Sequence, residues 1–569
     1  MLSKFIFAVC LSVLPAARAA DDTYARAEHD RLLNILSGEL FTEFKALGKK
    51  ETVPLYFLQY ELFDESLLRL SSFKGTEGTP EEFRYRNLDI TARFNDYSFD
   101  NTHQIKRGYG QGATLLTSAS MPLDDSDEDA IRGILWKQTD EAYKKAFSDY
   151  SEARTDLAVT ADEENKLPDF SPSEKVLHFD EVSMPEINKA EWQKKLNEVS
   201  AVFSKYPYVK SGNASLSVNA DNRYIVNTDG SRIKTGLLYI FLSVNSEAVA
   251  KDGMALSRYK MYHAASVKDL PGTEELKKEV EKQAAELKQL IDAPVISPYN
   301  GPVLLNARAA GVYFHEIIGH RLESHRQKLE KAGQTFAKEV GRKVTADFIN
   351  LYDDPTLSTL RGFYLRGHYT IDDEGVRAKR ADLVRNGVLR GFMTSRSPIK
   401  DFPYSNGHAR KAQGYLEVSR MGNTIIEASR TVPYRELRAR LIEECKKQKK
   451  EFGLIVDDIS GGFTNTSKSG SQSFTVQPLL VRRVYVDGRP DDVVRGVDLK
   501  GTPLSNFSKI ISAGDDYEVF NGTCGAESGW VPVSAVSPSI LISEMEVAAR
   551  TETYPKPPVL PSPYEEEDR

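Results

Sequence analysis

Two histidines and a glutamate in one short segment form the part of this sequence that is best suited to chemistry. They are His315, Glu316 and His320, and five of the chain's nine histidines lie between positions 315 and 408. Two neutral imidazoles can hold a metal ion, and an adjacent carboxylate can take a proton from water that the ion activates. These residue types therefore indicate a hydrolytic metal site.

The spacing of the two histidines does not suit a regular helix. His315 and His320 are five residues apart, which at about 100° per residue separates them by about 140° around an α-helix. A local π-type widening, often found at functional sites, would return them to one face, and Gly319 makes that distortion easier. On spacing alone, a shared metal ion and two unrelated helical histidines remain equal alternatives.

Two cysteines, Cys445 and Cys524, lie in the second half of the chain. In an oxidising compartment two cysteines are expected to pair. Cys445, however, continues an apolar helical stripe through Leu437 and Leu441, which is typical of a small core residue. Cys524 has glycine neighbours that predict a loop able to bend around a ligand. These settings favour separate roles, with a disulfide as the alternative.

Two segments resemble the sequence signatures of one known family. His315–His320, followed by Leu322 and Glu323, resembles the His-Glu-x-x-x-His signature of the TldD/PmbA family of metalloproteases. Gly522–Gly525, with Val531–Val533 and Pro538 behind it, resembles the late Gly-x-Cys-Gly and Val-Pro-Val segment of the TldD branch. Arg420–Thr424 and Gly461–Gly462 fall between them in the expected order. The resemblance is specific over about residues 300–550.

The resemblance implies a site and a chemistry. In this family the two motif histidines and the late cysteine bind zinc, which makes His315, His320 and Cys524 the expected ligands and Glu316 the expected general base. Three protein ligands with one open position are the arrangement of catalytic zinc. Members of the TldE/PmbA branch generally lack the motif, so its presence here implies the catalytic branch. Family members enclose the active site in a dimer, so we expect a homodimer or a heterodimer with a motif-lacking relative.

Other polar residues near the motif are weaker candidates. Glu323 follows Glu316 by seven residues, where it could orient a ligand histidine or lie on the surface. His325 is an alternative ligand, although a solvent-facing histidine is the more ordinary interpretation. His408 could stabilise a developing oxyanion or mark an ordinary turn, and no role is assigned to His368.

The elements that position these residues divide into two parts. Before residue 298, helices are predicted at about 23–47, 127–153 and 272–292, and strands at about 54–63, 85–99, 214–218, 224–227 and 237–244. Beyond the Pro-punctuated segment Pro294–Pro298, a strand at 303–305 leads to a helix from about 307 that carries the motif. Strands and Gly-rich turns then prevail from about 344, interrupted by a helix at about 433–449. The prediction is an α+β fold with a β-rich C-terminal half.

The N-terminus resembles a secretory signal peptide. Lys4 precedes the apolar run Phe5–Leu14, and Ala17-Arg18-Ala19 offers small residues for cleavage. The run is too short to span a bilayer, and a buried N-terminal helix is the alternative. The expected divisions are a signal peptide at 1–19, an α+β domain at 20–298, a metallopeptidase domain at 299–552 and a disordered Pro-rich acidic tail at 553–569. Familiar members of the family lack such a leader.

The composition narrows the classes of function. A formal net charge of -7 gives no basic footprint for nucleic acid, and no segment beyond the leader is long and apolar enough to predict a membrane span. We therefore expect a periplasmic or secreted zinc metallopeptidase that acts on unfolded or short peptides. The alternatives are a non-catalytic exported scaffold or peptide-binding subunit, and a metal-dependent amidase or esterase.

Overall fold

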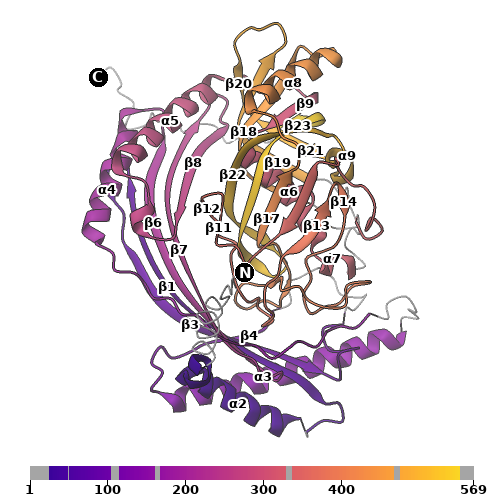
Figure 1. Ribbon diagram of the computed structural model, residues 1–569. Helices are drawn as coiled ribbons and strands as arrows, with labels where there is room; N and C mark the ends of the chain where they lie inside the picture. The colour runs from indigo at the N-terminus through magenta and orange to yellow at the C-terminus, as the bar shows by residue number, and fades with distance from the viewer. Residues whose placement is uncertain are drawn as a thin grey trace, which may run out of the picture.

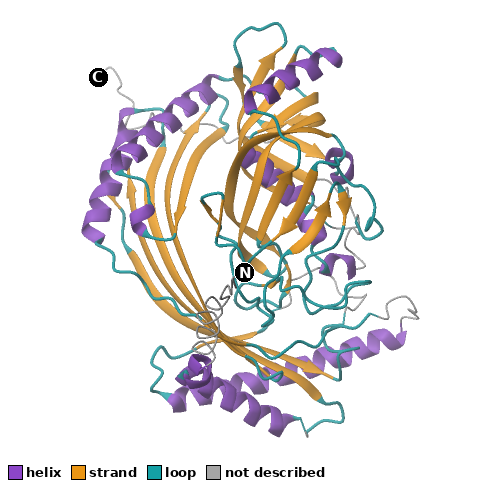
Figure 2. Ribbon diagram, in the orientation of Figure 1, coloured by secondary structure: helices purple, strands orange, loops and turns teal. Residues whose placement is uncertain are grey.

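The computed structural model describes residues 25–48, 50–103, 115–159, 167–328, 336–464, 466 and 474–550. The predicted signal peptide at 1–19 and the predicted tail at 553–569 lie outside the described residues. The described chain forms an α+β fold in two parts, a long curved N-terminal sheet beside a β-rich C-terminal half (Figures 1 and 2).

Among the described residues, the N-terminal half contains one eight-stranded sheet and the four helices α2 to α5. Its strand order is β4-β3-β1-β6-β7-β5, with β2 paired to β1 and β8 paired to β7. The strands are β1 (Leu55–Phe73), β2 (Thr76–Glu77), β3 (Glu81–Phe94), β4 (Thr117–Ser120), β5 (Leu177–Phe179), β6 (Ser211–Asn227), β7 (Arg232–Val249) and β8 (Ala255–Ala264). The helices are α2 (Arg31–Leu47), α3 (Glu128–Val159), α4 (Lys189–Ala201) and α5 (Thr273–Asp292), with short 3-10 turns η1 (Val202–Lys205) and η2 (Val267–Asp269).

All four helices cover the same face of this sheet. Even-numbered side chains of β1 such as Leu58 and Leu62 join the apolar core under α2 and α3, while Leu68 and Leu70 join the core under α4 and α5. Because side chains alternate along a strand, the odd-numbered residues of β1 point the other way, towards the C-terminal half (Figure 1). That second face carries polar residues such as Glu61 and Glu65.

One prediction for the N-terminal half was wrong, and α4, β2, β4, β5 and β8 were not predicted. The segments 214–218 and 224–227 are one continuous strand, β6, since residues 219–223 pair with β1 on one side and β7 on the other. Helix α4 was not predicted, although Asn188 caps its first turn by accepting from the backbone N–H of Glu191 at 3.2 Å. Its lysine-rich sequence gives only a narrow apolar stripe, with Leu196 and Val199 buried.

The C-terminal half contains an eleven-stranded sheet with the motif helix packed against it. The main strand order is β14-β13-β10-β17-β23-β21-β19-β18-β9, with β20 paired to β19 and β22 paired to β23. A further pairing between β23 and β9 closes a ring of strands. The sheet strands are β9 (Tyr299–Leu305), β10 (Ile349–Asp353), β13 (Ala381–Arg385), β14 (Val388–Leu389), β17 (Asn423–Ala428), β18 (Phe452–Thr464), β19 (Phe474–Tyr485), β20 (Asp492–Val494), β21 (Val497–Gly501), β22 (Ile510–Ala526) and β23 (Gly529–Ala549).

The remaining C-terminal elements are shorter. Two small strand pairs lie outside the main sheet, β11 (Thr359–Leu360) with β12 (Phe363–Tyr364) and β15 (Ala409–Arg410) with β16 (Val418–Ser419). The helices are α6 (Ala307–Ile317), α7 (His325–Lys328), α8 (Tyr434–Lys447) and α9 (Pro503–Phe507), with the 3-10 turn η3 (Gly319–Leu322). Among the described residues, no helix combines the length and the apolar character that crossing a membrane requires.

Candidate metal centre

Helix α6 places the first motif histidine at its C-terminal end. Strand β9 runs into α6, and the helix lies on the inner side of the large sheet with the residues around His315 buried. The helix ends at Ile317, because Ile318 leaves the helical region with φ -126° and ψ -38°. The chain then makes the 3-10 turn η3, which contains His320. The predicted π-type widening was therefore wrong, because a break in the helix turns the second histidine back.

Gly319 serves this turn through close packing. A Cβ atom at this position would lie 2.2 Å from the Sδ atom of Met421, so a larger residue here would have to displace that buried side chain. The turn brings the rings of His315 and His320 to a centroid distance of 4.9 Å with an interplanar angle of 81°. Both side chains are buried, with exposed fractions of 4% and 6%. The two histidines thus share one small buried volume.

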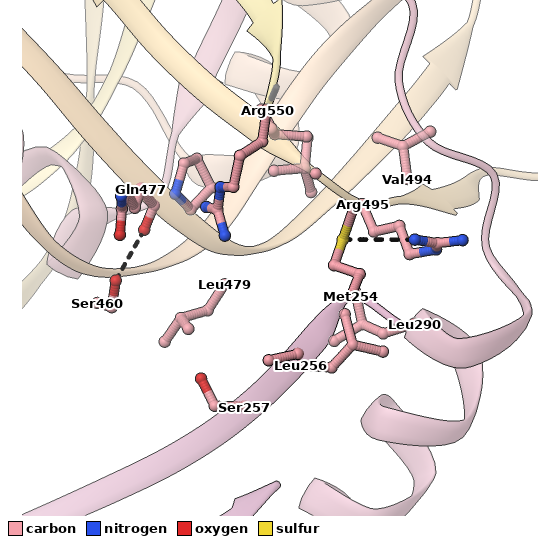
Figure 3. Close-up of a pocket in the computed structure, with 15 residues that line it drawn as sticks. Met254, Leu256, Ser257, Leu290, Ser460, Gln477, Leu479, Val494, Arg495 and Arg550 are labelled. Atoms are coloured by element: carbon pink, nitrogen blue, oxygen red, sulfur yellow. Dashed lines mark hydrogen bonds between the residues drawn. The ribbon is translucent and has the colours of Figure 1, made fainter. Parts of the chain in front are cut away.

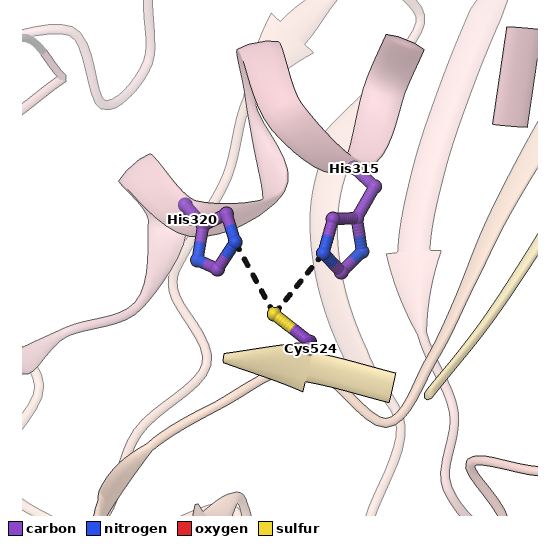
Figure 4. A group of neighbouring side chains, drawn as sticks. All are labelled: His315, His320 and Cys524. Atoms are coloured by element: carbon purple, nitrogen blue, oxygen red, sulfur yellow. Dashed lines mark hydrogen bonds between the residues drawn. The ribbon is translucent and has the colours of Figure 1, made fainter. Parts of the chain in front are cut away.

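Cys524 completes the group from the other side. It lies within strand β22, paired with Val531 of β23, so the predicted loop was wrong and the glycines around it belong to a hairpin. Its Sγ atom is 3.2 Å from the Nε2 atom of His315 and 3.2 Å from the Nε2 atom of His320 (Figure 4). Cys524 and Cys445 are both free, and Cys445 packs with Leu437 and Leu441 as predicted. The alternative of a disulfide is therefore wrong in this structure.

The donor set fits a tetrahedral metal ion. One ligand atom from each of His315, His320 and Cys524 lies within 4.8 Å of the others. A zinc ion with bonds of about 2.0–2.3 Å separates its nitrogen and sulfur donors by about 3.5 Å, close to the distances found here. The structure thus brings together all three predicted ligands, in a set that suits zinc and leaves a fourth position open.

Charges in this group stabilise one another. Burial by itself would raise the pKa of the Cys524 thiol, but the two histidines and Arg420 outweigh it and hold that pKa well below its ordinary value. Burial also opposes a charged His320, yet Cys524 and Glu323 raise the pKa of that imidazole well above its ordinary value. The thiolate that metal binding requires is therefore favoured by the surrounding residues.

Glu323 orients the second histidine. Its side chain is fully buried, and its Oε1 atom lies 3.2 Å from the Nδ1 atom of His320, which leaves the Nε2 atom directed at Cys524. Burial would raise the pKa of Glu323, but His320 and Arg326 outweigh it and lower that pKa to about 2. Glu323 therefore orients His320 as one alternative predicted, and the other alternative, that Glu323 lies on the surface, is wrong.

Two arginines that the sequence did not single out support this arrangement. Arg420 is fully buried, donates from Nη2 to the backbone oxygen of Cys524 at 2.7 Å, and has its Nε atom 3.4 Å from Glu323. Arg326 donates to Glu323 at 3.0 Å and to Glu527 through two hydrogen bonds. Arg420 belongs to a segment that resembled the family, but its contacts come from residues about a hundred positions away, which no local pattern reveals.

Glu316 lies next to the group in a close-packed position. It is 7% exposed, and a Cβ atom on Gly462 of β18 would lie 2.5 Å from its Cγ atom. Burial raises the pKa of Glu316. The charges of the two ligand histidines lower that pKa, and the charge of Cys524 raises it. A raised pKa makes the carboxylate a stronger base, which suits a role in proton transfer.

The other histidines have structural partners. His325 is buried, with its Nδ1 atom 3.0 Å from the hydroxyl of Ser419, so the expectation of a solvent-facing side chain was wrong. His408 is also fully buried, with its Nε2 atom 3.3 Å from Asp353, which keeps it from a substrate oxyanion. His368 has its Nδ1 atom 2.8 Å from the backbone oxygen of Pro355.

A pocket at the junction of the two halves lies apart from these residues (Figure 3). Its lining includes Met254 and Leu290 from the N-terminal half and Arg495 and Arg550 from the C-terminal half. Both arginines have acidic partners, Arg495 with Asp252 at 2.7 Å and Arg550 with Asp498 at 3.2 Å. With its charges paired in this way, the pocket offers no reactive group.

Comparison with known proteins agrees with the site. A family profile described as the PmbA/TldA metallopeptidase C-terminal domain matches residues 298–549, which include His315, His320 and Cys524. Residues 298–549 therefore match the C-terminal metallopeptidase domain of the TldD/PmbA family. The chain is 29% identical over 315 residues to a protein from Archaeoglobus fulgidus named metalloprotease. This alignment covers 55% of this chain and 67% of that protein. It is 28% identical over 250 residues to a Saccharolobus solfataricus protein named zinc metalloprotease TldD homolog. This alignment covers 43% of this chain and 51% of that protein.

The fold agrees with the same family. The structure of TldE from Thermococcus kodakarensis is similar with a TM-score of 0.57 at 14% sequence identity, covering 90% of this chain and all of that one. At this identity the likeness concerns the fold. The chain aligns with about half to two thirds of the length of these two curated relatives.

Proposed function

We propose that the protein is an exported zinc metallopeptidase that hydrolyses peptide bonds in unfolded or short peptides. The observation that carries the proposal is the convergence of His315, His320 and Cys524, with their donor atoms within 4.8 Å of one another. The names of relatives in the family, metalloprotease and zinc metalloprotease, support the same chemistry.

Each residue of the site has its own role in the proposed reaction. A zinc ion held by His315, His320 and Cys524 would supply a Lewis acid that polarises the peptide carbonyl and acidifies water. Glu316 takes the proton from the attacking water and returns it to the leaving amine. Glu323 holds His320 in the ring orientation that directs its Nε2 atom inward, and Arg420 fixes the strand that carries Cys524.

Burial of the site argues for the substrate class. His315, Glu316, His320 and Cys524 are between 4% and 7% exposed. A bond within a folded domain cannot approach groups buried to this extent, whereas an extended chain can enter as a single strand. Unfolded or short peptides are therefore the substrates that suit this geometry.

Other features support the location and the partner that we propose. The leader-like segment with Lys4, Phe5–Leu14 and Ala17–Ala19 supports export to the periplasm or beyond. The resemblance to the TldD/PmbA family supports a dimer, formed either with a second copy or with a relative that lacks the motif. Export would separate the enzyme from cytoplasmic substrates.

The test combines metal analysis with proteolysis. The purified mature protein is expected to contain about one zinc per chain and to cleave an unfolded protein substrate. A chelator should remove both metal and activity, and zinc should restore both. Metal-free protein with full proteolytic activity would contradict the proposal. Bound zinc without peptide cleavage, but with hydrolysis of simple amides or esters, would favour the other hydrolase class.

A further inference from the structure

The helix-free face of the N-terminal sheet contains a group of polar side chains opposite the C-terminal half. Along β6, β7 and β8, the pairs Asn219–Tyr239 and Phe241–His263 lie in adjacent rows of the sheet. The Oδ1 atom of Asn219 and the Nε2 atom of His263 are buried and have no hydrogen-bond partner among the described residues. The same holds for the Oδ1 atom of Asp221, two residues along β6.

Arg366 reaches this face from the C-terminal half. It follows β12, which contacts β7 through a hydrogen bond from the Tyr364 hydroxyl to the backbone oxygen of Leu238 at 3.2 Å. β11 and β12 lie on the inner side of the N-terminal sheet in Figure 1. The Arg366 guanidinium lies over the rings of Tyr239 and Phe241, at 5.7 and 5.5 Å from their centroids.

Among the residues that the structure describes, the charge of Arg366 has no anionic contact partner. Within the described residues its guanidinium makes no ion pair within 4.0 Å and its Nε atom is buried without a hydrogen bond. Burial is the main cause that lowers the pKa of this side chain, although an arginine stays charged near neutral pH. The charge of Asp221 raises the pKa of Arg366. Burial and the nearby Glu65, however, raise the pKa of Asp221 itself to about 7, so Asp221 is a weak counter-charge for Arg366. A half-buried guanidinium in this setting is suited to an anion from outside the chain.

The position of Arg366 relates it to the metal centre. Its backbone N–H donates to the side-chain oxygen of Asn521 at 3.1 Å, and Asn521 precedes Cys524 by three residues on β22. Three residues of an extended strand span about 10 Å and place the two side chains on opposite faces of β22, so a peptide strand along the edge of β22 away from β23 would have side chains on both faces. An extended peptide needs about the same number of its own residues to cover that distance.

We propose that Arg366 binds a carboxylate of the peptide substrate about three residues from the bond that is cleaved. The inference rests on the proposed peptidase function and adds a substrate preference to it. A carboxylate suits the site because the planar guanidinium can donate two parallel hydrogen bonds to it. The group is either the C-terminal carboxylate of a short peptide or the side chain of an aspartate or glutamate, and both present the same chemistry.

Matched peptides separate the two sources of the carboxylate. One series compares a free C-terminus with an amidated one, and a second compares glutamate with glutamine three residues from the cleaved bond. Wild-type protein should lose roughly 10- to 100-fold in kcat/KM when the bound carboxylate is neutralised, as expected for a hydrogen bond to a charged group. The series in which the loss occurs identifies the source.

The variants test whether Arg366 causes the preference. Arg366→Gln should cleave charged and neutral peptides at the same reduced rate, and Arg366→Lys should keep part of the preference through its charge. Arg361→Gln is the matched control, since Arg361 lies in the same segment, is exposed, and contacts the ring of Tyr517. It should retain the full preference. Equal cleavage of all peptides by wild type, or an unchanged preference in Arg366→Gln, would overturn the inference.

A binding measurement separates this inference from the proposed function. Fluorescence anisotropy of a labelled peptide on the wild-type protein and on Glu316→Gln requires no cleavage. Charged peptide should bind roughly 10- to 100-fold more tightly than its neutral match, and Arg366→Gln should abolish the difference. If such binding occurs without any peptide cleavage, the carboxylate site stands and the peptidase proposal fails. If peptides are cleaved but no difference in binding appears, the carboxylate site is wrong and the peptidase proposal stands.

Discussion

At the scale of single residues, Cys524 distinguishes this centre from a pair of histidines. It supplies the sulfur that both imidazole Nε2 atoms face at 3.2 Å, and it is 5% exposed. A soft thiolate binds zinc more strongly than a hydroxyl does. The surrounding charges lower the pKa of its thiol, so the ligand form is favoured before any ion arrives.

Cys524→Ser is therefore expected to lose bound zinc and peptidase activity together, as measured by elemental analysis and by cleavage of an unfolded substrate. Cys445→Ser is the control, because Cys445 is equally buried but packs among the apolar residues of α8. It should keep metal and activity while losing about 1–3 kcal/mol of unfolding free energy for a buried hydroxyl. Stoichiometric zinc in Cys524→Ser would exclude the thiolate from the site.

Glu316→Gln separates proton transfer from metal binding. The amide keeps the size of the side chain but cannot accept the proton, so kcat should fall by about 10²- to 10⁴-fold while zinc content stays near that of wild type. Glu443→Gln, an exposed position on α8, should change neither quantity. Wild-type turnover by Glu316→Gln would assign the general base to another group.

At the scale of elements, the close approach of β18 to α6 positions Glu316. A Cβ atom on Gly462 would lie 2.5 Å from the Cγ atom and 2.9 Å from the Cδ atom of Glu316, whereas one on the neighbouring Gly461 meets nothing within 4 Å. Two adjacent glycines on one strand therefore have different roles. Gly462 leaves space for the carboxylate, and Gly461 does not contact it.

Gly462→Ala should displace the carboxylate by about the size of a methyl group. A misplacement of about 1 Å can cost about 10²-fold in rate, and the three metal ligands are not touched, so zinc should be retained. Gly461→Ala should have activity close to wild type. Steady-state kinetics with zinc analysis on the pair checks this, and equal activity of both variants would show that Glu316 has room to move.

How far the sequence predicted these elements depends on the range of the contacts involved. The motif helix near residue 307, the helix around Leu437–Cys445 and the long N-terminal strands β1, β3, β6 and β7 followed from local periodicity. The break after Ile317 did not, because it depends on Gly319 packing against Met421, about a hundred residues away. The strand at Cys524 was also missed, since pairing with β23 outweighs its glycine neighbours.

Some residues of the candidate site were predicted from the sequence, and others were not. His315, His320 and Cys524 were predicted from residue types and the family resemblance, and the structure brings their donor atoms together. Arg420 and Arg326 were not predicted, because an arginine has no local signature for the carboxylate it will meet in the fold. Arg420 meets Glu323 across about a hundred residues of sequence. Arg326 lies only three residues after Glu323, but its other carboxylate partner, Glu527, lies about two hundred residues further on.

At the scale of the whole molecule, buried charges join the two halves. Lys411 of the C-terminal half is fully buried, with its Nζ atom 2.8 Å from Glu61 and 2.7 Å from Asp89 of the N-terminal sheet. Glu417 lies 3.6 Å away. Burial opposes the charge on Lys411, but the three carboxylates outweigh it and raise the pKa of the lysine. The relative position of the two halves, and with it the face opposite Arg366, depends on this group.

Lys411→Met tests that dependence, because methionine keeps most of the volume and removes the charge. Breaking a buried ion pair leaves uncompensated carboxylates and typically costs about 3–5 kcal/mol, so urea unfolding should begin at a clearly lower denaturant concentration. Lys400→Met, an exposed lysine of the same half, should unfold as wild type does. Adding Glu61→Gln to Lys411→Met should recover part of the loss, since one unpaired charge is then removed. Unfolding of Lys411→Met at the wild-type midpoint would mean that apolar contacts alone hold the halves together.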